Sequence, residues 1–161
     1  MKLAIIYHSE TGNTEKAAEF VKAGMEKVEG VEVATYSIKD VTAEDIADVK
    51  GIVFGAPTYI ATCSWQMVQF METAKMPFTD KLGAAFSTAN FTHGGSEMTL
   101  NGLNTLMLAK GMVVYSGGVS HGMPMSHIGQ NAFVNNAKVE DKADALIAFG
   151  EKFAKKAVEL F

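Results

Sequence analysis

The chain contains 161 residues, of which 48% are hydrophobic and 20% are charged, and its formal net charge is −4. A chain of this length can bury about 70% of its unfolded surface in one core, so we expect a single domain over residues 1–161. The mild negative charge argues against nucleic acid or an anionic membrane as a partner. All 14 basic residues are lysine, which excludes sites that depend on bidentate arginine contacts. One cysteine and no signal sequence or long apolar span predict a cytoplasmic protein.

The first segment, from Leu3 to Tyr7, is a short apolar run typical of a strand buried on both faces. A turn rich in hydroxyl groups follows. Apolar side chains then recur at helical spacing from Ala17 to Val28, which predicts a helix that ends near Glu29.

The later segments continue this alternation of strands and helices. The predicted strands are residues 31–36, 51–55, 82–87 and 112–115, and the predicted helices are residues 64–75, 97–110 and 140–160. We also expect a short helix capped by Thr42, an N-cap at Ser96, and a long loop over residues 117–136. Trp65, Val68 and Met71 lie at helical spacing, which supports the helix over residues 64–75. In the last helix, the residues predicted to face the core are Ala145, Phe149, Phe153 and Ala157. The alternation predicts an α/β fold with a parallel sheet covered by helices on both faces.

The turn after the first strand has the features of a phosphate site. Ser9, Thr11 and Thr14 supply hydroxyl groups around Gly12, which can take a positive φ. The helix that follows has N–H groups without intrahelical partners and the positive end of its dipole at this point. The loop contains no lysine, so neutral donors alone would hold the phosphate; a capped helix start without a ligand is the alternative.

The spacing Ser-x-Thr-Gly-x-Thr after a first strand resembles the phosphate loop of flavodoxins, which bind the ribityl phosphate of FMN. The resemblance implies a flavodoxin-like, doubly wound, five-stranded parallel sheet in the order 2-1-3-4-5, with the flavin at the switch between the first and third strands. The dinucleotide fingerprint G-x-G-x-x-G and a Walker A lysine are absent. The residues implied to bind the phosphate are Ser9, Glu10, Thr11, Gly12, Asn13 and Thr14.

Three stretches contain no Asp, Glu or Lys: residues 51–71, 82–96 and 111–137. Each combines a predicted strand with the loop at its carboxyl end, where charged side chains are usual. These loops are expected to enclose an apolar ligand such as an isoalloxazine ring, or to contact another subunit of a homo-oligomer, or to be plain Gly/Ser/Thr turns.

Two of these loops extend the resemblance. Residues 57–60 follow the third strand, where flavodoxins contact the flavin ring. The resemblance therefore implies that Pro57, Thr58, Tyr59 and Ile60 contact the ring, with Tyr59 on a ring face. Residues 87–97 resemble the Gly-rich loop of WrbA-type NAD(P)H:quinone oxidoreductases, whose backbone amides bind the flavin pyrimidine. The residues implied there are Ser87, Thr88, Ala89, Asn90, Phe91, His93, Gly94 and Gly95.

The remaining candidates are single side chains. His93, Tyr59 and His121 are possible substrate contacts, while no side chain is predicted to be catalytic because the flavin would carry the chemistry. Trp65 is expected either to stack on the flavin or to pack in the core, and His8 to be a spacer. Cys63 lies near a helix start but lacks an acid–base partner, so we expect a buried thiol. No histidine spacing predicts a metal site.

Two functions fit these residues. The first is an FMN-dependent oxidoreductase that takes two electrons from NADH or NADPH and passes them to a quinone-like or other small acceptor. The alternative is a flavodoxin that carries single electrons between redox proteins; carriers of this kind place a glycine beside the flavin, where the backbone turns to a positive φ. Residues 58–61 contain no glycine and the β-branched Ile60 disfavours that conformation, so we expect the enzyme. A flavin-binding protein without turnover is a third, plainer alternative.

Overall fold

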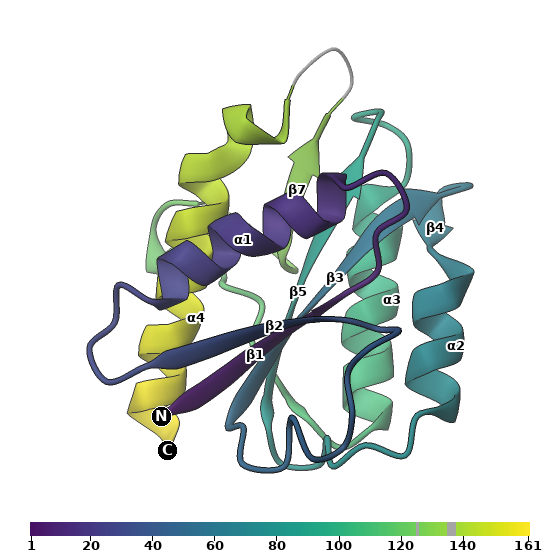
Figure 1. Ribbon diagram of the computed structural model, residues 1–161. Helices are drawn as coiled ribbons and strands as arrows, with labels where there is room; N and C mark the ends of the chain where they lie inside the picture. Colours follow the sequence, from purple (N-terminus) through teal and green to yellow (C-terminus); the bar gives the residue numbers. More distant parts are fainter. Residues whose placement is uncertain (125, 135–137) are drawn as a thin grey trace.

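The computed structural model describes residues 1–124, 126–134 and 138–161, and its centre is a parallel sheet (Figure 1). The sheet has the strand order β2-β1-β3-β5-β6 and confirms the predicted order 2-1-3-4-5. Its strands are β1 (Lys2–Tyr7), β2 (Glu32–Ser37), β3 (Gly51–Tyr59), β5 (Leu82–Ala89) and β6 (Val113–Val114).

Helices cover both faces of this sheet, as the alternation predicts. Helices α1 (Asn13–Met25) and α4 (Ala143–Leu160) pack on one face, and α2 (Trp65–Thr73) and α3 (Ser96–Ala109) pack on the other (Figure 1). Alternate side chains of β1 serve the two cores: Leu3 and Ile5 face α1 and α4, whereas Ala4 and Ile6 face α2 and α3.

The fifth position in the sheet is shared by two short strands. β6 pairs with the beginning of β5, and β7 (Gln130–Phe133) pairs with its end. The sequence predicts a loop over residues 117–136, and this is wrong for the residues that form β7; residues 125 and 135–136 of the predicted loop lie outside the described part of the chain. β5 has eight residues and β6 covers only two of them, so the rest of its edge needs a second partner.

Several predicted element boundaries are also corrected. β3 continues through Pro57 to Tyr59 and turns back in a hairpin with β4 (Thr62–Cys63). The pairing of β3 with β1 ends at Gly55. Pro57 therefore lies beyond the part of β3 that pairs with β1, where its lack of a backbone N–H removes no hydrogen bond between these two strands. Thr42 exchanges hydrogen bonds with Asp45, but only turns follow, so the short helix expected there is absent.

The helices differ from the predictions in which side chains they bury. In α2 the buried residues are Met67 and Met71, while Trp65 is 65% exposed and therefore does not pack in the core. α4 follows a 3-10 turn (Val139–Lys142), and Leu146 replaces Ala145 in the buried stripe that otherwise matches the prediction. The N-cap of α3 is Gly95, not Ser96, and α1 ends at Met25 rather than near Glu29.

Helices α1 and α4 approach each other through two glycines. A Cβ atom on Gly150 would lie 2.0 Å from the Val21 carbonyl oxygen, and one on Gly24 would lie 1.9 Å from the Ile147 carbonyl oxygen. This contact holds α1, and with it the loop at its N-terminus, against the rest of the fold. None of the helices in the described residues is long and apolar enough to cross a membrane.

Candidate functional site

Three loops meet where β1, β3 and β5 end. They are the turn that enters α1, the tip of the β3–β4 hairpin, and residues 90–95 before α3 (Figure 1). The loops enclose two cavities of about 120 and 480 Å³. Both cavities are lined by Thr58, Tyr59, Ala89 and Asn90, so they form one continuous pocket.

The smaller cavity lies at the N-terminus of α1. Gly12 is the N-cap with φ 87°, and no side chain caps this end of the helix. Its N–H donates to the Ser9 hydroxyl over 3.1 Å, which leaves the Ser9 proton available to a ligand. The exposed Thr11 hydroxyl accepts only a long 3.4 Å bond from Asn13 Nδ2. This end of α1 therefore offers uncapped backbone N–H groups and neutral hydroxyls to an anion.

A buried threonine pair forms the floor of this cavity. Thr14 Oγ1 and Thr88 Oγ1 are 2.8 Å apart, and both residues are almost completely buried. The two hydroxyls carry two protons and need only one for their mutual bond, so the second can point to a ligand. A similar pair, Thr58 and Thr99, joins β3 to α3 over 2.9 Å.

The donor set fits the phosphate monoester of FMN. Hydroxyl, amide and backbone N–H groups can all donate to phosphate oxygens, and the helix dipole favours negative charge here. The larger cavity, between the hairpin and residues 90–94, has room for a flat ring system beside the phosphate site.

The tip of the β3–β4 hairpin has an unusual backbone. Ile60 has φ 49° and Ala61 has φ 58°, although neither is a glycine. Two consecutive positive values are the hallmark of a tight two-residue hairpin turn, which Gly and Asn usually form. Gly95 packs so closely on this tip that a Cβ there would lie 2.6 Å from Ala61 Cα. The expectation that Ile60 keeps the backbone out of this conformation is therefore wrong.

His8 connects the phosphate loop to the start of α2. The ring is buried, with Nε2 3.3 Å from Glu10 Oε1 and Nδ1 2.9 Å from Ser64 Oγ. A carboxylate only accepts, so Nε2 carries the proton and Nδ1 accepts from the Ser64 hydroxyl. Gln66 Nε2 donates to the same carboxylate oxygen over 2.9 Å. His8 is therefore not a spacer, since it orients Glu10 at the pocket wall.

Burial shifts the pKa values around this network. It lowers the pKa of His8 below its ordinary value, against the opposing effect of the Glu10 carboxylate, so the ring is neutral at neutral pH. Burial and the same carboxylate raise the pKa of Tyr59, whose ring meets His8 edge-on with centroids 6.5 Å apart. Both groups are thus uncharged hydrogen-bonding partners at the pocket.

Comparison with known proteins shows the family of the chain. The flavodoxin domain model matches residues 4–116. A flavodoxin of Clostridium saccharobutylicum is 39% identical over 162 aligned residues, which cover the whole of both proteins. The chain belongs to the flavodoxin family.

Other proteins similar to the chain bear different names. An NAD(P)H dehydrogenase (quinone) of Geotalea daltonii is 26% identical over 81% of this chain and 75% of its own length. The crystal structure of a WrbA-like flavodoxin from Agrobacterium tumefaciens superposes with a TM-score of 0.78 over 98% of each chain at 24% identity, a likeness that concerns the fold.

The fold brings most of the predicted site residues of this flavodoxin-family protein to the pocket. Ser9 and Gly12 shape the turn beside it, whereas Ser87 is buried and bonds to Asn131 in β7. His93 is exposed, and Gly95 supports the hairpin tip from outside the cavities. The predicted residues that line the two cavities are Glu10, Thr11, Asn13, Thr14, Pro57, Thr58, Tyr59, Ile60, Thr88, Ala89, Asn90, Phe91 and Gly94.

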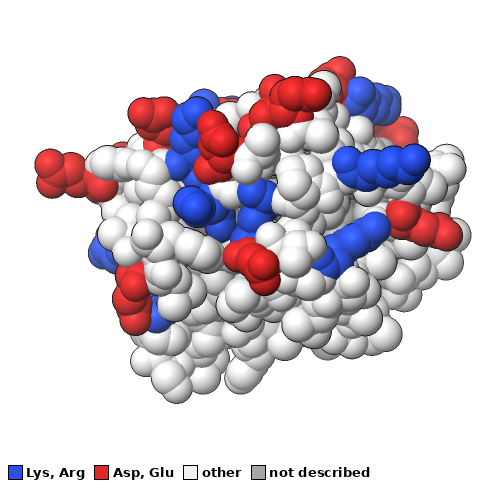
Figure 2. Space-filling view, turned by 90° about the horizontal axis from the view of Figure 1, so that it is seen from below, with Lys and Arg blue, Asp and Glu red and all other residues white. Residues whose placement is uncertain are grey.

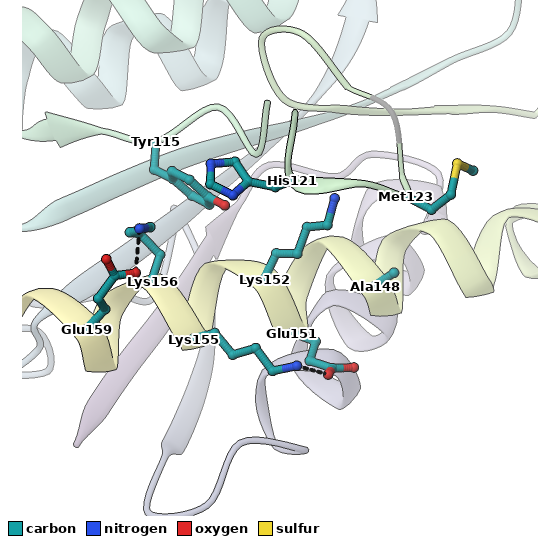
Figure 3. A pocket seen from close by; sticks show the side chains of 9 residues that line it. All are labelled: Tyr115, His121, Met123, Ala148, Glu151, Lys152, Lys155, Lys156 and Glu159. Atoms are coloured by element: carbon teal, nitrogen blue, oxygen red, sulfur yellow. Dashed lines mark hydrogen bonds and ion pairs between the residues drawn. The ribbon is translucent and has the colours of Figure 1, made fainter. Parts of the chain in front are cut away.

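His121 lies away from this pocket. It stands beside Tyr115, with ring centroids 5.8 Å apart, in a separate cavity of about 560 Å³ along α4 (Figure 3). Lys155 pairs with Glu151 on the same helix and points away from both rings (Figure 3). The structure therefore does not bring His121 together with Tyr59 and His93.

Sequence reasoning missed four residues at or next to the site. Ala61 and Val134 line the pocket, and Ser64 and Gln66 belong to the His8 network. Val134 directly follows β7, and only recognition of that strand would have revealed it. Cys63 is buried, as predicted, and burial raises the pKa of its thiol to about 11, which disfavours the reactive thiolate at neutral pH.

Proposed function

We propose that the protein binds FMN in the continuous pocket and carries single electrons between redox proteins. The observation that carries this proposal is the positive φ of Ile60 and Ala61 at the pocket wall. The sequence argument against a carrier was that this turn lacks a glycine. Because the turn takes the backbone conformation that carriers use without a glycine, it supports the carrier instead of opposing it.

The residues divide the binding of FMN between them. Backbone N–H groups at the start of α1, with Ser9, Thr11 and Asn13, would hold the phosphate, and the hairpin and residues 90–94 would enclose the ring. Bound FMN supplies the redox chemistry, since it can exchange one or two electrons. The chain's part is to bind, to orient and to limit access of water.

The charge of the surrounding face also supports a carrier. Residues 51–74 and 82–109, which contribute most of the pocket wall, contain no lysine, and the chain contains no arginine. A nicotinamide dinucleotide brings a pyrophosphate, which usually needs cations or a helix N-terminus. The N-terminus of α1 is assigned here to FMN, which leaves the N-terminus of α3 as the further helix end at this face for a dinucleotide.

A second candidate is the two-electron NAD(P)H oxidoreductase expected from the sequence, with a quinone-like acceptor. The relative named NAD(P)H dehydrogenase (quinone) and the resemblance of residues 87–97 to WrbA-type loops support it.

Reductive titration of the FMN-loaded protein distinguishes the two candidates. For a carrier we expect two well-separated one-electron midpoint potentials and no steady-state oxidation of NADH or NADPH with a benzoquinone. A single two-electron transition together with turnover would assign the protein to the second candidate. A protein that takes up no added FMN, judged by its visible spectrum and by quenching of FMN fluorescence, would contradict both.

A further inference from the structure

The cavity along α4 lies apart from the pocket proposed for FMN. Tyr115, His121 and Met123, from the chain that follows β6, line one wall, and side chains of α4 line the other (Figure 3). Its volume of about 560 Å³ exceeds that of either cavity at the FMN pocket and is typical of a small-molecule site. The two pockets share no lining residue, so this cavity needs a ligand of its own.

The charges at this cavity do not balance. Lysines and carboxylates lie interspersed on the surface seen from below in Figure 2, whereas three lysines and only two glutamates of α4 line the cavity. Lys155 pairs with Glu151, and Lys156 pairs with Glu159. In the part of the chain that the structure describes, no carboxylate pairs with Lys152. One positive charge at the cavity therefore lacks a counter-charge.

The position of Lys152 in α4 explains why it has no carboxylate. Residues three and four positions away are neighbours on a helix surface, and none of those around Lys152 is acidic. Its ammonium donates instead to the carbonyl oxygens of Gly122 and Pro124 in the facing loop. An ammonium has three protons, so one remains for a ligand. Burial lowers the pKa of Lys152, which shows that this charge is partly withdrawn from water.

Two aromatic rings lie on the same side of α4 as the Lys152 ammonium (Figure 3). Tyr115 and His121 meet edge-on, with centroids 5.8 Å apart and planes at 65°, and the Lys156 ammonium lies 6.0 Å from the centroid of the Tyr115 ring. The Met123 side chain, 72% exposed, lies at the other end of the cavity (Figure 3). Aromatic and thioether surfaces beside a cation suit a ligand that is part aromatic and part anionic.

We propose that this cavity binds a small aromatic carboxylate, with its carboxylate on the Lys152 ammonium and its ring against Tyr115, His121 and Met123. A monoanion matches the single positive charge that lacks a counter-charge, and a flat ring adds a third aromatic group to the edge-on pair. The proposal does not rest on the function proposed for the FMN pocket, because the two sites share no residue.

NMR titration of the isotope-labelled protein with benzoate, with and without saturating FMN, tests the proposal. We expect saturable shift changes at Tyr115, His121 and Lys152, with a dissociation constant of about 1 mM or lower in both conditions. Benzyl alcohol keeps the ring and lacks the charge, whereas acetate keeps the charge and lacks the ring. Each should bind at least about tenfold more weakly than benzoate, and this comparison needs no variant protein.

Matched lysine variants then assign the carboxylate. Lys152→Met should weaken benzoate binding by about tenfold or more, because a hydrogen bond from a charged donor is lost. Lys155→Met is the control on the same helix; because Lys155 pairs with Glu151 and points away from the rings, the loss should be about twofold at most (Figure 3). Lys152→Arg, which keeps the charge, should retain most of the binding.

Four results would overturn the proposal. They are no saturable change at Tyr115, His121 and Lys152 up to about 10 mM benzoate, equal affinity for benzoate and benzyl alcohol, equal losses from Lys152→Met and Lys155→Met, and tighter binding of inorganic phosphate than of benzoate. The last result would indicate a plain anion site without a role for the rings. Failure of the FMN site is seen separately, because the titration without FMN does not depend on it.

Discussion

The buried pair of Thr14 and Thr88 offers the sharpest test of the phosphate site. Thr14→Val keeps the shape of the side chain but removes its hydroxyl, so the Thr88 hydroxyl loses its 2.8 Å partner at a site that is only 4% exposed. An unsatisfied buried hydroxyl costs about 1–3 kcal/mol. The apoprotein should therefore unfold at lower urea. If the same hydroxyl also donates to the phosphate, FMN affinity should fall by a similar free energy, which is about fivefold to 150-fold.

The double variant Thr14→Val/Thr88→Val separates the two effects. Replacing both partners removes the unsatisfied hydroxyl, so most of the lost stability should return, whereas FMN affinity should stay low because neither proton is available. Urea unfolding of the apoprotein and quenching of FMN fluorescence measure the two quantities. If the dissociation constant for FMN stays within about twofold of the parent in both variants, Thr14 does not bind the phosphate and the assigned orientation of the loop is wrong.

Three further predictions concern the fold and its titrating groups. Gly150→Ala should lower the free energy of unfolding in urea by about 1–3 kcal/mol, because the new Cβ would meet the Val21 carbonyl. The control Gly102→Ala, whose new Cβ would have only Cys63 Cβ nearby at 3.9 Å, should be neutral or stabilising. Equal effects of the two substitutions would contradict the close contact of α1 and α4. The pKa of His8 is lower in the folded protein than in the unfolded chain, so the unfolded chain binds the extra proton more readily. The contribution of neutral His8 to stability is therefore present above pH 6.5 and is lost as the pH falls through the folded pKa. The difference in unfolding free energy between the parent and His8→Asn, measured from pH 8 to pH 5, should shrink towards acid; a constant difference would refute the assignment. With its pKa at about 11, Cys63 should react with a disulfide reagent at pH 8 at least about a hundredfold more slowly in the native protein than in urea, and a fast native reaction would show that the thiol is accessible.

Much of this protein follows from short-range patterns in its sequence. Apolar runs alternating with helical spacing predict the order of strands and helices, since each pattern depends only on which side chains one element must bury. The phosphate loop is equally local: Ser9, Thr11, Gly12 and Thr14 lie within six positions, and the turn they form is decided by their own hydroxyls and by the freedom of glycine. For this reason the fold and one half of the pocket could be predicted before any tertiary contact was known.

Other features depend on segments that lie far apart in the chain, and only the tertiary structure decided them. Ser64 lies 56 positions after His8, so no local pattern could show that the two side chains bond. β7 forms because β5 leaves an edge unpaired, although its own four residues carry a weak strand signal. The strained turn at Ile60 runs against its local preference and persists because the flanking strands pair and Gly95 packs on its tip. Local residue preferences determine which segments become strands and helices, whereas pairing and packing across the sheet determine how these elements meet, and the pocket forms where they meet.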